Sequence, residues 1–129
     1  MSDIYQDFIL EIYSNPLNFG KIENADFHSG ASNPLCGDVI EIFLKVKDGR
    51  VADVKYAGKG CAISQVSASL LTESLKGKTV EEAKKLTKDD VLKLIRVDLS
   101  KNPSRMKCAL LSLEVLKKAL SGGKSDKQL

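Results

Sequence analysis

Residues 39–56 read VIEIFLKVKDGRVADVKY, and this stretch decides the fold. Apolar and polar residues alternate in its first half, which is the pattern of a strand with one buried face. Asp48-Gly49 follows, a dipeptide typical of two-residue hairpin turns, and residues 51–56 resume a strand pattern. The stretch predicts an antiparallel hairpin. The Gly-, Asn- and Ser-rich segment before it predicts one further short edge strand near residues 22–27.

Helical patterns flank the hairpin on both sides. Their apolar residues recur at helical spacing, and capping or helix-ending residues stand at their ends. The expected helices lie over residues 4–13, 61–75, 80–86, 89–95 and 102–120. We therefore predict an α+β fold in which a three-stranded antiparallel sheet packs against helices. One domain is expected over residues 1–120, followed by a flexible polar tail over residues 121–129.

Composition restricts the classes of function. Of the 129 residues, 43% are hydrophobic and 29% are charged, a balance that supports a buried core. The net charge is +3 and only 5% of residues are aromatic, so we expect no nucleic-acid partner. The sequence has neither a run of about 18 apolar residues nor the basic and apolar regions of a secretory signal. We therefore expect no membrane partner and a cytoplasmic location.

The three cysteines carry the functional signal. Cys36, Cys61 and Cys108 are odd in number and widely spaced, which argues against a disulfide framework. Cys61 and Cys108 lie near predicted helix starts, where backbone N–H groups and the helix dipole favour a thiolate. Asp38 stands two residues after Cys36, so in an extended segment both side chains point the same way. Three cysteines and one aspartate can hold tetrahedral Zn²⁺ or an iron–sulfur cluster.

Two other interpretations of the cysteines are weaker. Cysteine is often buried as a small hydrophobic residue, but glycine turns and the nearby carboxylate argue against simple core packing here. A cysteine hydrolase needs a base, and the single histidine, His28, lies in a Ser- and Gly-rich stretch without a triad pattern. We expect His28 to be an exposed loop residue.

Three blocks of the sequence resemble the signature blocks of the NifU-N/IscU/SufU family of iron–sulfur scaffolds. They are PLCGD at 34–38, GKGCAIS at 58–64 and RMKCAL at 105–110. The resemblance extends over roughly residues 4–120 and implies a SufE/NifU-like α+β fold. It also implies that zinc or a nascent [2Fe-2S] cluster binds to Cys36, Asp38, Cys61 and Cys108.

The resemblance implies a scaffold protein rather than an enzyme. Such a scaffold receives sulfur from a cysteine desulfurase, builds a transient [2Fe-2S] cluster on the three cysteines and Asp38, and transfers it to recipient apo-proteins. Cys108 is the expected persulfide acceptor. The alternative is a zinc-dependent sulfurtransferase that accepts persulfide from a desulfurase and stimulates it. In that alternative Arg105 is expected to engage the desulfurase; otherwise it is a solvated cation of the first helical turn. The block around Arg105 is closer to SufU-type members and favours that alternative.

The chain also departs from both subfamilies. Lys107 stands before Cys108, where IscU-type members carry histidine, so the fourth ligand falls to Asp38 or to a group outside the chain. A homo-oligomer that shares its cluster would supply such a group. The spacing of 47 residues between Cys61 and Cys108 lacks the insertion usual in SufU-type members. The Leu-Pro-Pro-Val-Lys segment that IscU-type members offer to a chaperone is absent.

Overall fold

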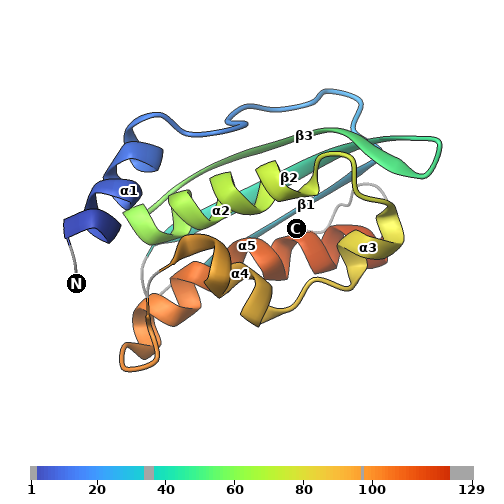
Figure 1. Ribbon diagram of the computed structural model, residues 1–129. Helices are drawn as coiled ribbons and strands as arrows, with labels where there is room; N and C mark the ends of the chain where they lie inside the picture. The colour runs from blue at the N-terminus through green and yellow to red at the C-terminus, as the bar shows by residue number, and fades with distance from the viewer. Residues whose placement is uncertain (1–2, 34–36, 97, 123–129) are drawn as a thin grey trace.

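The computed structural model describes residues 3–33, 37–96 and 98–122, which form a sheet and a set of helices (Figure 1). The strands are β1 (Phe27–Asn33), β2 (Asp38–Lys47) and β3 (Arg50–Lys59), antiparallel and in the order β1-β2-β3. The helices are α1 (Asp3–Ser14), α2 (Ala62–Leu75), α3 (Val80–Lys84), α4 (Lys88–Ile95) and α5 (Pro103–Gly122). The α+β fold with a three-stranded antiparallel sheet is confirmed.

The predicted hairpin forms β2 and β3. Lys47 pairs with Arg50, so the connection is the dipeptide Asp48-Gly49. Both turn residues have positive φ, 55° and 78°, as a type I′ turn requires. Further along, the register shifts by one residue between Lys45 and Val46, which is a β-bulge on the β3 side. On the side of the bulge away from the turn, each β2 residue therefore pairs with the β3 residue one position later than it would in a hairpin without a bulge.

The predicted position of the edge strand is wrong. The strand begins where the prediction ended, at Phe27, and continues to Asn33. Its sequence, FHSGASN, has no regular apolar alternation, because its place is set by pairing with β2 and by packing against α5. The expectation that His28 lies in a loop is wrong for the same reason. The earlier chain instead runs along the other edge of the sheet, where Phe19 bridges to Tyr56.

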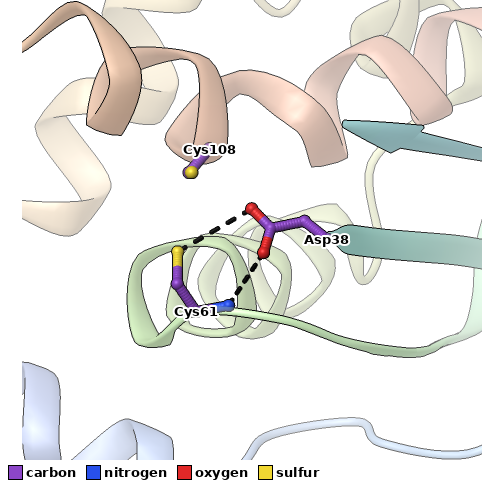
Figure 2. Close-up of side chains that lie close together, drawn as sticks. All are labelled: Asp38, Cys61 and Cys108. Carbon is purple, nitrogen blue, oxygen red and sulfur yellow. Dashed lines mark hydrogen bonds between the residues drawn. The ribbon is translucent and has the colours of Figure 1, made fainter. Parts of the chain in front are cut away.

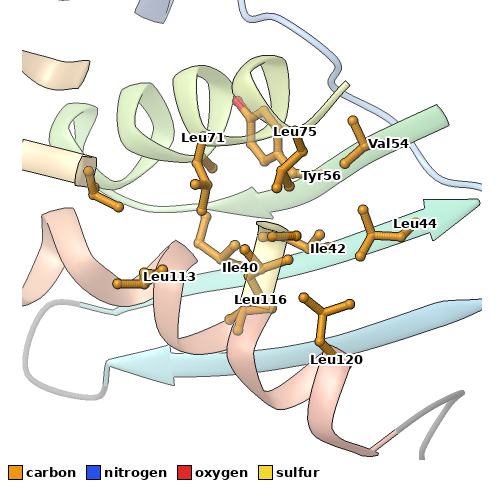
Figure 3. Packing of buried hydrophobic residues seen from close by; sticks show 14 of the residues in the cluster. Ile40, Ile42, Leu44, Val54, Tyr56, Leu71, Leu75, Leu113, Leu116 and Leu120 are labelled. Atoms are coloured by element: carbon orange, nitrogen blue, oxygen red, sulfur yellow. The ribbon is translucent and has the colours of Figure 1, made fainter. Parts of the chain in front are cut away.

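The main core lies between the sheet and two long helices. Helices α2 and α5 lie side by side against one face of the sheet (Figures 1 and 3). Alternate residues of β2 point into this layer and are fully buried, as the period-two pattern predicts: Ile40, Ile42 and Leu44. Large side chains from the other elements complete the cluster, among them Val54, Tyr56, Leu71, Leu75, Leu116 and Leu120.

The starts of α3 and α4 follow the predicted capping signals. Thr79 and Thr87 each form a full capping box, with Glu82 and Asp90 respectively. Helix α3 ends at Lys84, earlier than predicted, and α5 continues through Ser121 and Gly122, beyond the expected domain end. The rest of the predicted tail, residues 123–129, lies outside the described residues. None of the helices in the described ranges is long and apolar enough to span a bilayer.

Candidate metal and cluster site

Asp38, Cys61 and Cys108 meet at one end of the sheet (Figure 2). One ligand atom from each residue lies within 4.8 Å of the others. Asp38 begins β2, Cys61 caps the N-terminus of α2, and Cys108 lies in the second turn of α5. The fold therefore joins three of the four predicted ligand residues. The fourth, Cys36, lies outside the described residues.

The hairpin brings Asp38 and Cys61 together. Since β2 and β3 are antiparallel, the start of β2 and the end of β3 lie at the same edge, and Val39 pairs with Lys59. The chain then leaves the sheet and enters α2, with Cys61 in an extended conformation at φ −72° and ψ 165°. Asp38 lies one residue before Val39, and Cys61 lies two residues after Lys59, so both lie just outside this last strand pair.

Cys108 arrives from α5, which is anchored beside α2. The hydroxyl of Ser67 on α2 donates to the carbonyl oxygen of Ala109, and it lies 3.1 Å from the hydroxyl of Ser112. At the start of α5, the Asn102 side chain accepts a 3.2 Å hydrogen bond from the Arg105 amide. Pro103 follows this cap as the first helical residue, a position that suits proline. These contacts fix the turn that carries Cys108.

The carboxylate of Asp38 is completely buried. Its Oδ1 accepts a hydrogen bond of 2.8 Å from the backbone N–H of Cys61, and its Oδ2 lies 3.8 Å from the Cys61 Sγ. Burying a carboxylate is costly unless its charge is balanced. A divalent cation shared between this carboxylate and two thiolates would balance it.

Apolar side chains surround the two sulfur atoms. Cys108, only 2% exposed, belongs to a second buried cluster, and the partly buried Cys61 packs against it. Helix α1 contributes Ile9 and Ile12 to the same cluster. Because apolar packing lowers the local dielectric constant, electrostatic attraction between a metal ion and its ligands is stronger on this side of the site than in solvent.

The donors fit both candidate occupants. Two thiols and one carboxylate are a normal partial set for Zn²⁺, which takes four ligands of these types. Iron–sulfur clusters are likewise held mainly by cysteine thiolates. In either case, the three described donors leave a position for one more ligand. Cys36 was predicted for the set on sequence grounds and would complete it.

The other predicted residues lie outside this group of donors. His28 stacks on Phe43, with ring centroids 4.3 Å apart, and its Nε2 is 3.5 Å from Glu41 Oε2. Arg105 and Lys107 are exposed on the first turns of α5. Sequence reasoning missed the role of the Cys61 amide, because that contact depends on the strand register.

Comparison with known proteins identifies the family to which this chain belongs. The family model of the NifU-like N-terminal domain matches residues 4–127. The chain belongs to this family, as its three cysteine blocks predicted.

Individual relatives carry two different descriptions. The chain is 40% identical to iron–sulfur cluster assembly scaffold protein IscU 1 of Archaeoglobus fulgidus, over 96% of this chain and 82% of that protein. It is 35% identical to the zinc-dependent sulfurtransferase SufU of Bacillus subtilis, over 94% of this chain and 92% of that protein. The crystal structure of FiSufU from Fervidobacterium islandicum AW-1 superposes with a TM-score of 0.76, at 30% identity over 92% of this chain and 97% of that one.

Proposed function

We propose that this chain is an iron–sulfur cluster assembly scaffold. It receives sulfur from a cysteine desulfurase, assembles a transient [2Fe-2S] cluster as its cargo, and passes the cluster to recipient apo-proteins. The observation that supports this most is the meeting of Asp38, Cys61 and Cys108 within 4.8 Å at one end of the sheet. Membership of the NifU-like N-terminal domain family and the IscU relatives support the same function.

Each ligand has its own part in this proposal. Cys36, Cys61 and Cys108 supply thiolates, and Asp38 supplies a hard oxygen ligand that a recipient's thiolate can replace. For sulfur transfer, the Cys108 thiolate attacks the outer sulfur of the desulfurase persulfide. A new S–S bond forms on Cys108, the donor S–S bond breaks, and the desulfurase cysteine leaves as a thiolate. A thiol reductant outside the chain then supplies two electrons per persulfide, which releases the outer sulfur as the sulfide of the cluster and restores the Cys108 thiolate.

A second function is favoured by the 35% identity to a zinc-dependent sulfurtransferase. In it, Zn²⁺ holds the thiolates until the desulfurase supplies a competing ligand, and one thiolate then accepts the persulfide sulfur. Arg105, exposed one helical turn before Cys108, would contact the desulfurase. This function requires the zinc-loaded protein to raise desulfurase turnover, which the scaffold function does not require.

Anaerobic incubation with iron, cysteine and a desulfurase separates the two functions. Iron, acid-labile sulfide and zinc are then measured on the reisolated chain, and its mass in solution is determined. Equal amounts of iron and sulfide, with zinc displaced, support the scaffold, and a mass of two or more chains per cluster supports a shared cluster. Zinc retained without sulfide supports the sulfurtransferase. Binding of neither metal contradicts both functions.

The release step is tested with Asp38→Ala. Because the variant removes the exchangeable oxygen ligand, the half-life of cluster transfer to an apo-ferredoxin should change. Asp53→Ala, which removes an exposed carboxylate of β3, is the matched control and should transfer at the wild-type rate. Equal half-lives for wild type and Asp38→Ala would exclude Asp38 from release.

A further inference from the structure

Gly60 lies directly against the Asp38 carboxylate. A Cβ atom at Gly60 would lie 2.7 Å from Cγ and 2.9 Å from Cα of Asp38, closer than real Cβ contacts. Gly60 also has a φ of +143°, which side-chain-bearing residues rarely adopt. The space that a side chain would occupy at residue 60 is therefore the space that Asp38 fills.

The strand register creates this contact. Val39 pairs with Lys59, so the residues just outside this pair, Asp38 and Gly60, face each other. The turn alone would have placed Asp38 opposite Lys59. The one-residue shift between Lys45 and Val46 replaces that lysine with a glycine at the position opposite the carboxylate.

The next residue, Cys61, contacts the same carboxylate through a backbone hydrogen bond. The Cys61 N–H donates to Oδ1 of Asp38 over 2.8 Å, so this oxygen is already occupied by a backbone donor. Oδ2 lies 3.8 Å from the Cys61 Sγ, and Figure 2 shows it on the side of the carboxylate that faces the two sulfur atoms. The two oxygens of Asp38 thus have different surroundings.

We propose that Gly60 is a positioning residue for Asp38. Together with the Cys61 amide, it fixes the carboxylate so that Oδ1 anchors the turn and Oδ2 alone is offered to a metal ion or cluster. Asp38 is then a ligand through one oxygen only, and its orientation is set before any metal arrives. This inference rests on the proposed function in one respect, namely that Asp38 ligates the bound metal.

Zinc affinity and the Co²⁺ spectrum of Gly60→Ala test the proposal. The added Cβ displaces the carboxylate, so Zn²⁺ affinity should fall by about 10–100-fold, as is usual when the support of a ligand is lost. The absorption bands of Co²⁺ bound in place of zinc should also change, since they report the coordination geometry directly. Wild-type affinity together with a wild-type Co²⁺ spectrum would overturn the proposal.

Gly20 is a matched control for backbone strain. Its φ of +146° is nearly identical to that of Gly60, but its Cβ would make only an ordinary 3.6 Å contact with Lys55. Gly20→Ala should lower stability while leaving the Zn²⁺ affinity and Co²⁺ spectrum of the folded protein unchanged. If Gly20→Ala changes the spectrum as Gly60→Ala does, the proposal fails.

A metal-free measurement tests the anchor if Gly60→Ala does not fold. Asparagine at residue 38 keeps an oxygen that can accept from the Cys61 amide, whereas alanine does not. Hydrogen exchange of that amide should therefore stay slow in Asp38→Asn and become faster in Asp38→Ala. Equal protection in wild type and Asp38→Ala would overturn the proposal. Because no metal is present, this result stands even if the wild-type protein binds neither zinc nor cluster, which would contradict the proposed function alone.

Discussion

The guanidinium carbon of Arg96 lies 4.5 Å from the centroid of the Phe8 ring, which joins the end of α4 to α1 by a cation–π contact. Arg96 is the C-cap of α4 and has a left-handed backbone, with φ at 62°. Since this conformation costs a non-glycine residue on the order of 1 kcal/mol, the contact with Phe8 offsets part of the strain. Helix α1 also places Ile9 and Ile12 against the cluster that contains Cys108. The position of α1 therefore affects access to the thiols.

Phe8→Ala should loosen α1. A cation–π contact at an exposed site contributes about 0.5–1 kcal/mol, so the amides of α1 should exchange roughly two to five times faster than in wild type. Amide hydrogen exchange followed by mass spectrometry measures this. Tyr13→Ala is the control, because it removes an aromatic ring that is 47% exposed on the same helix. Similar acceleration in both variants would show that the contact with Arg96 does not hold the helix.

The two described thiols should differ in their rates of alkylation. In the metal-free protein, Cys61 is partly exposed and Cys108 is only 2% exposed, so iodoacetamide should label Cys61 first. Peptide mass spectrometry in a Cys36→Ser background resolves the two sites. Phe8→Ala should speed the labelling of Cys108 if α1 limits access to it. Equal labelling of both thiols in the wild-type background would mean that the burial of Cys108 is not maintained in solution.

The capping boxes predict a defined acid response. Hydrogen bonds from the backbone N–H groups of Thr79 and Thr87 lower the pKa values of Glu82 and Asp90. A lowered pKa in the folded state means that each carboxylate stabilises the fold above its unfolded pKa, which is about 4. This contribution is lost as the pH falls through the lower, folded pKa. The combined variant Glu82→Gln/Asp90→Asn should therefore unfold at a lower urea concentration than wild type at pH 6. At pH 3 the two midpoints should lie much closer together.

A carboxylate outside the boxes provides the comparison for this pH series. Asp89 is exposed in the first turn of α4 but does not accept the capping bond of Thr87. Asp89→Asn should show a smaller difference from wild type at pH 6. A gap between wild type and the combined variant that stays constant from pH 6 to pH 3 would contradict the assignment of the two lowered pKa values.

Local patterns predicted the hairpin and most helix ends because their causes are local. The Asp48-Gly49 turn and the two threonine caps each act over four residues or fewer. Strand β1 was misplaced because its sequence is not amphipathic, and pairing with β2 determines where it lies. At the site, the sequence and the family resemblance indicated Asp38, Cys61 and Cys108. The hydrogen bond from the Cys61 amide to Asp38 and the close approach of Gly60 to it were not predictable, since both depend on a bulge that has no sequence signature.

Arg105→Glu should have opposite effects on stability and on desulfurase stimulation. Arg105 lies in the first turn of α5, where no acidic residue is present and where a cation opposes the helix dipole. The charge reversal should raise stability by about 0.3–1 kcal/mol, measured as a higher thermal midpoint.

If Arg105 engages the desulfurase, the same variant should stimulate that enzyme less at unchanged zinc content. Lys47→Glu is the matched charge reversal and should leave stimulation unchanged, because Lys47 ends β2 whereas Asp38 begins it, so Lys47 lies far from the site. Wild-type stimulation by Arg105→Glu would remove Arg105 from the desulfurase contact, because reversing a charge at an interface changes the rate of association.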